Sequence, residues 1–111
     1  MASEEPGLDT HEWESEWQAL EPLVVDSPAE ALSELDHLVE RMLIEAGYPI
    51  ETADPVDDEG IDPELLVSFR AAQEISRQVD RGETVDPGDV GLAVGIYREI
   101  YEHLLARERA D

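Results

Sequence analysis

The chain has 111 residues, the size of a single domain, and it can bury enough apolar surface to fold without a disulfide or a structural metal ion. It has no cysteine, which excludes disulfide bonds and thiol nucleophiles, and no apolar run approaches the ~20 residues of a membrane-spanning helix. Its 29 acidic residues against 7 basic residues give a net charge of −22, so like-charge repulsion argues against nucleic acids and anionic membranes as partners.

The first predicted element is a short helix over residues 10–21, preceded by a tail at 1–9 that we expect to be disordered. Trp13 and Trp17 are four residues apart and place two large apolar surfaces on one side of this helix. The apolar run at 23–25 follows a proline, and we predict that it forms the turn to the second helix.

The second predicted helix covers residues 28–46. Ser27 precedes Pro28 as a cap, and Glu30 completes a capping box by reaching back toward the cap. Gly47 suits the left-handed residue that follows a helix. The apolar positions recur with helical period and form a wide stripe typical of a core-facing helix: Ala31, Leu32, Leu35, Leu38, Val39, Met42, Leu43 and Ala46.

An acidic loop at 47–61 separates the second helix from a third predicted helix at 63–81. The loop resembles a calcium-binding loop at first sight, but its glycine and its acidic residues do not fall at the positions that an EF-hand requires. The third helix has the same start signal, an aspartate before Pro63, and ends at Gly82. Its predicted core positions are Leu65, Leu66, Phe69, Ala72, Ile75 and Val79.

The fourth predicted helix covers residues 87–108 and again begins with an aspartate and a proline. Its predicted core positions are Val90, Ala93, Val94, Tyr97, Ile100, Tyr101, Leu104 and Leu105. The fold class is therefore all-α: a small antiparallel bundle of three long helices plus a shorter N-terminal helix. Residues 10–108 form one helical domain that contains the acidic loop.

Gly91 and Gly95 are the least expected residues of the fourth helix. They lie one turn apart in a stretch that is apolar almost all round, and each costs about 1 kcal/mol relative to alanine inside a helix. Close approach of another helix would compensate for this cost, and the tryptophan-bearing helix of the same chain is favoured over a second chain. The candidate interface therefore consists of Trp13, Trp17, Gly91, Leu92, Gly95 and Ile96, although the two tryptophans are better explained as core residues.

Metal and catalytic motifs are weak in this chain. Glu34 and His37 have the Glu-x-x-His spacing of di-iron bundles, but the motif occurs once and both residues are predicted to face solvent. Glu99 and His103 form a possible cation pair that is also expected on a solvated face. No histidine has a partner at the spacing of a nucleophilic relay. We therefore expect no enzyme activity, no cofactor and no metal site.

The sequence resembles a group of small acidic helical proteins of unknown function from high-GC actinobacteria. The resemblance implies a helical fold and a bacterial source, and it implies no activity. It rests on helix starts and core positions, which are Trp17, Val25–Pro28, Leu38, Val39, Asp62, Pro63, Phe69–Ala72, Asp86–Val90, Tyr97, Arg98, Leu104 and Leu105.

These features predict a cytoplasmic, non-catalytic protein–protein interaction module, with another protein or a second copy of the chain as its partner. Glu4 and Glu5 stand where a secretion signal has basic residues, which favours the cytoplasm. The alternative functions are an acidic DNA mimic that antagonises a basic protein and, last, a metal-storage bundle. The acidity itself is best explained by a high-salt or high-GC source.

Overall fold

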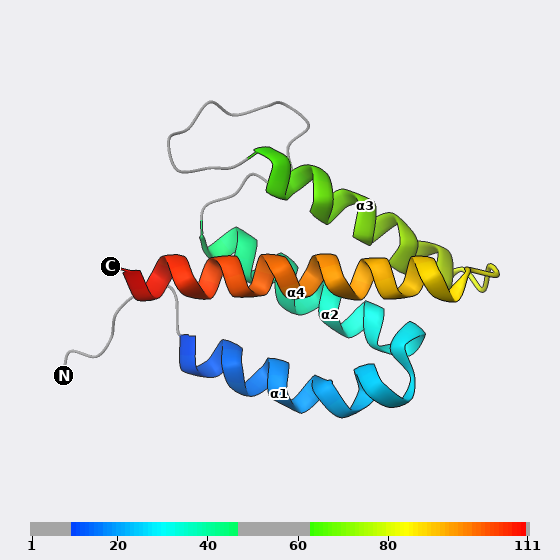
Figure 1. Ribbon diagram of the computed structural model, residues 1–111, viewed down its shortest axis with the longest axis horizontal. Coiled ribbons are helices and arrows are strands. Elements are labelled where there is room, and N and C mark those ends of the chain that lie inside the picture. Colours follow the sequence, from blue (N-terminus) through cyan, green and yellow to red (C-terminus); the bar gives the residue numbers. More distant parts are fainter. Residues whose placement is uncertain (1–9, 47–62, 111) are drawn as a thin grey trace.

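The computed structural model describes residues 10–46 and 63–110, which contain four helices (Figure 1). They are α1 (Thr10–Asp26), α2 (Pro28–Glu45), α3 (Pro63–Asp80) and α4 (Pro87–Ala110), and the described residues include no strand. Consecutive helices run in opposite directions, so the predicted all-α antiparallel bundle is confirmed. The predicted tail at 1–9, the acidic loop at 47–61 and Gly47 lie outside the described residues.

The centre of the bundle is the pair α2 and α4. In Figure 1, α4 crosses in front of α2, while α3 and α1 flank the pair on opposite sides. α3 packs on both central helices, whereas α1 packs mainly on α2 and touches α4 along a narrower strip. This arrangement covers the inner face of α4 and leaves the opposite face of that helix without a neighbouring helix among the described residues.

The predicted turn at 23–25 is wrong, because α1 continues as a helix through Pro22 to Asp26. A proline inside a helix removes one backbone hydrogen bond, but Pro22 is exposed and water can reach the carbonyl that loses its donor. Leu23 and Val24 pack against the core from this last turn. Their burial favours continuation of the helix over the local preference for a turn.

The capping box predicted at Ser27 is also wrong, since the side chain of Ser27 makes no capping hydrogen bond. Ser27 is the single residue between α1 and α2, and its amide donates to the Leu23 carbonyl of the preceding helix at 2.7 Å. Its ψ of 72° lies outside the β region in which a cap side chain meets the first amides of the next helix.

The end of α3 follows the prediction at Gly82, which has a φ of 80°. The Gly82 amide donates to the Val79 carbonyl at 2.9 Å, and the Glu83 amide donates to the Gln78 carbonyl at 3.0 Å. This pair of bonds is the Schellman motif, which satisfies the last carbonyls of a helix. A glycine is required here because other residues are strained at positive φ.

The hydrophobic core joins the inner stripes of all four helices, as their periodicity predicts. Phe69 and Tyr97 meet edge to face at its centre, with their ring centroids 6.2 Å apart, and both residues are fully buried. No helix in the described part of the chain combines the length and apolar character needed to cross a bilayer.

Candidate functional site

The outer side of α4 differs from the acidic surface expected of this chain. Residues 90–97 contain no charged side chain, although the chain carries a net charge of −22. Gly91, Leu92 and Gly95 are exposed on this stretch and Ile96 is half-buried, while the side chain of Leu92 keeps 57% of its surface accessible. We call these four residues the α4 face.

The prediction that α1 packs against the two glycines is wrong. A Cβ added at Gly91 or at Gly95 would meet nothing within 4 Å, so no described part of the chain approaches this strip. The reason lies further along α4, where the Trp17 ring stacks on the Tyr101 ring with centroids 4.3 Å apart. Two stacked aromatic rings fill the space between α1 and α4 and leave no close backbone approach for small residues to permit.

The two tryptophans of the predicted interface belong to the core. Trp13 is 3% exposed and Trp17 is 5% exposed, so they present almost no surface to a partner. Trp17 makes three contacts: its ring stacks on Tyr101, its Nε1–H donates to Glu21, and the guanidinium of Arg98 lies 5.9 Å from its ring centroid. The structure therefore brings together the four α4 residues of the predicted interface and separates them from the two tryptophans.

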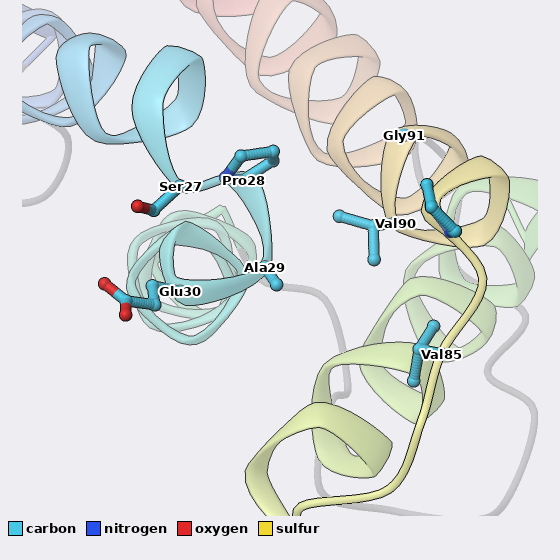
Figure 2. A pocket seen from close by; sticks show the side chains of 8 residues that line it. Ser27, Pro28, Ala29, Glu30, Val85, Val90 and Gly91 are labelled. Atoms are coloured by element: carbon cyan, nitrogen blue, oxygen red, sulfur yellow. The ribbon is translucent and has the colours of Figure 1, made fainter.

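A groove that the sequence does not reveal lies beside the start of the α4 face. Figure 2 shows Pro28 and Ala29, at the start of α2, across a gap from Val85 and Val90. The groove has a volume of about 440 Å³, within the range of sites that bind small molecules or anchor side chains. Its lining is mostly apolar and consists of Ser27, Pro28, Ala29, Glu30, Val85, Pro87, Val90 and Gly91.

Gly91 links the groove to the α4 face, because it belongs to both. Trp17 stacks on Tyr101, and Glu21 lies 3.6 Å from Arg98, so α1 runs antiparallel to α4 beside the part of α4 that follows the α4 face.

Acidic residues flank the lining of the groove along the sequence. Asp26, Asp86 and Asp89 are exposed next to residues that line the groove. Glu30 is exposed and lines the groove itself, with its carboxylate turned away from Val90 in Figure 2. The two chain segments that line the groove, residues 27–30 and 85–91, contain no basic residue. The combination is an apolar centre with a negatively charged border.

A second group of polar residues lies between α2, α3 and α4. The hydroxyl of Tyr97 donates to the Asp36 carboxylate at 2.8 Å, and the side chains of Ser76 and Gln73 extend the network. Ser76 is 3% exposed, and every buried side-chain nitrogen and oxygen in the described residues has a hydrogen-bond partner. A fully satisfied network of this kind fixes how helices pack, so we assign it a structural role. The sequence signal for it is Ser76, a serine on the apolar stripe of α3.

Replacing Tyr97 by phenylalanine tests this role. Tyr97→Phe removes the donor to Asp36 and the oxygen that Ser76 contacts, while it keeps the buried ring. We expect the free energy of unfolding to fall by about 1–3 kcal/mol, because buried polar groups lose their partner. Urea denaturation followed by circular dichroism measures the change. Tyr101→Phe is the matched control, and a loss as large in that variant would contradict the assignment.

The pH dependence of stability gives a second test. Burial raises the pKa of Asp36 above its usual value of 3.8, and this effect outweighs the hydrogen bonds from Tyr97 and Gln73, which lower it. A carboxyl group whose pKa is raised by folding stabilises the folded state at low pH, and this stabilisation disappears as the pH rises through the raised pKa. We therefore expect Asp36→Asn to gain stability relative to the wild type as the pH goes from about 4 to 7.

Urea denaturation of both proteins across this pH range measures the difference. The contributions of the other carboxylates cancel in the comparison between variant and wild type. A difference that does not change with pH, or that changes in the opposite direction, would show that folding does not raise the pKa of Asp36.

The two histidine motifs that resemble metal ligands face solvent, as expected. Glu34 and His37 are exposed on α2, and Glu99 and His103 are exposed on α4. Within residues 10–46 and 63–107, no group of three or more histidine or acidic side chains is arranged to hold a metal ion. The loop that resembles a calcium site lies outside these ranges.

Comparison with known proteins does not extend this description, since no family model, no curated protein and no solved structure matches the chain. The α4 face and the adjacent groove are therefore the features of the molecule on which a functional proposal rests.

Proposed function

We propose that this chain is a non-catalytic protein–protein interaction module that binds its partner through the α4 face and the adjacent groove. The observation that carries the proposal is the uncharged stretch 90–97 of α4, on which Gly91, Leu92 and Gly95 are exposed and Leu92 is 57% accessible. An exposed apolar surface bordered by polar residues is typical of a binding site in a protein that is otherwise well solvated.

The glycines of α4 support the same conclusion. Gly91 and Gly95 each destabilise the helix by about 1 kcal/mol relative to alanine. No described part of the chain lies close enough for either glycine to be needed inside the bundle. Residues that break a local folding rule without an internal reason are expected at functional sites. A partner that approaches the bare backbone of α4 supplies such a reason.

Site-specific photo-crosslinking tests the proposal. A photoreactive residue replaces Leu92 on the α4 face, and a control protein carries it at Val67, which is 69% exposed on α3. Both proteins are expressed in the source cells and irradiated. We expect one dominant crosslinked protein from position 92 and none above background from position 67, because only the first position lies in the proposed interface.

A second candidate function, an acidic antagonist that mimics DNA, is favoured by the charge of −22 alone. It requires contacts spread over carboxylates in place of a local apolar surface, and binding that weakens steeply with salt. Equal crosslinking from positions 92 and 67 to the same basic protein would support the antagonist and contradict the interaction module. No crosslinked protein at position 92 would contradict the module as well.

A further inference from the structure

We infer that the segment bound at the α4 face is a basic amphipathic helix of a different protein, with apolar side chains for the groove and flanking lysines or arginines for its acidic border. This inference rests on the proposed function and identifies the chemistry of the partner.

Charge complementarity predicts that the residues flanking the apolar face of the partner helix are basic. Glu30 lines the groove, and the exposed Asp26, Asp86 and Asp89 directly adjoin its lining residues in sequence, while the lining segments 27–30 and 85–91 contain no basic residue. The nearest arginine on α4, Arg98, is already engaged by Glu21 and by the Trp17 ring. A neutral or acidic segment would partly desolvate these carboxylates without supplying a positive charge. A basic segment forms ion pairs with them.

A second copy of the chain is disfavoured by the same charges. Each copy carries a net charge of −22, and association through one acidic border would place two such surfaces against each other. The basic residues of the chain do not reverse this, because 7 of them stand against 29 acidic residues. A basic partner gains attraction at the same surface.

The shape of the surface favours a helix as the bound segment of the partner. Gly91 and Gly95 lie one helical turn apart and leave a bare strip of backbone that lets a second helix come close, as small residues do between packed helices. Leu92 stands beside this strip, and the groove opens at the end of the strip at Gly91. An amphipathic helix can lie along the strip and insert an apolar anchor side chain into the groove.

A synthetic peptide provides the probe. It is a helix of about 15 residues with leucines along one face and lysines at its flanks, and a control peptide carries glutamates in place of the lysines. Each is titrated into the full-length ¹⁵N-labelled protein at physiological ionic strength. We expect the lysine peptide to shift the amide resonances of residues 25–30 and 85–96, and the glutamate peptide to leave them unchanged.

Two sets of variants separate local binding from general attraction. Glu30→Gln, Asp86→Asn and Asp89→Asn together remove three of the four border charges, while Glu34→Gln, Glu45→Gln and Glu102→Gln remove as much charge elsewhere from exposed positions. We expect the border variant to bind the lysine peptide about tenfold more weakly than the control variant.

The apolar part of the site is tested by Gly91→Leu, which fills the start of the groove without changing charge. It is compared with Ala106→Leu, at an exposed position on the far half of α4. We expect Gly91→Leu to lower the affinity for the lysine peptide at least tenfold and Ala106→Leu to leave it unchanged. Circular dichroism confirms that both variants keep their helices.

Three results would overturn the inference. The first is a set of resonance shifts spread over all acidic surfaces, with peptide binding weakened equally in both charge variants. This result would mean that the peptide is attracted to the whole acidic protein and not to one site. The second is equal binding of the glutamate peptide. The third is sedimentation of the free protein as a dimer that Leu92→Glu dissociates, which means that a second copy occupies the site. In each case a partner crosslinked from position 92 would still support the proposed interaction module, so the two proposals fail separately.

Discussion

Replacing Trp17 by alanine is expected to lower the free energy of unfolding by about 3–5 kcal/mol, a large part of the total for a domain of this size. Trp17 is 5% exposed and connects α1 to α4 by stacking on Tyr101. Its loss leaves a cavity between these helices and removes the hydrogen bond to Glu21. Urea denaturation followed by far-ultraviolet circular dichroism measures the change.

The matched control is Val25→Ala on the same helix. Val25 is 76% exposed, so this change is expected to alter the free energy of unfolding by less than about 0.5 kcal/mol. A loss of about 1 kcal/mol or less in Trp17→Ala would show that α1 does not depend on its aromatic contact with α4. The same unfolding curves would then identify α1 as a separately fraying helix.

The second prediction is an increase in the free energy of unfolding, from replacement of the two exposed glycines of α4. Gly91→Ala and Gly95→Ala together are expected to raise the free energy of unfolding by about 1–2 kcal/mol and the Tm by roughly 5–10 °C. Alanine favours the helix, and a Cβ at either position meets nothing within 4 Å. Differential scanning calorimetry at several protein concentrations measures the shift.

Gly82→Ala is the control for glycine replacement in general. Gly82 has a φ of 80° at the end of α3, so alanine there is strained and is expected to destabilise the protein by about 1–2 kcal/mol. Destabilisation by Gly91→Ala and Gly95→Ala that grows with protein concentration would show that a second copy packs on the strip. A double variant that is more stable but no longer binds the partner would show that the two glycines lower the stability of α4 and are needed for binding.

Three helix starts and the end of α3 were predictable because they depend on neighbouring residues. A capping residue followed by proline predicted the starts at Pro28, Pro63 and Pro87, where the three helices begin. Gly82 predicted the end of α3 for the same reason, since the left-handed conformation and its two hydrogen bonds involve residues of a single turn. The apolar stripes predicted which side of each helix enters the core.

The sequence by itself therefore determined the fold class, the helix starts and the inner faces, because all of these follow from contacts within a few residues. Only the tertiary structure decided that α1 passes through Pro22 and that the face at Gly91 and Gly95 is open. It also brought Asp36 to Tyr97 and Pro28 to Gly91. These features depend on the distance and the angle between helices, which stacked rings such as those of Trp17 and Tyr101 set and which no local pattern encodes.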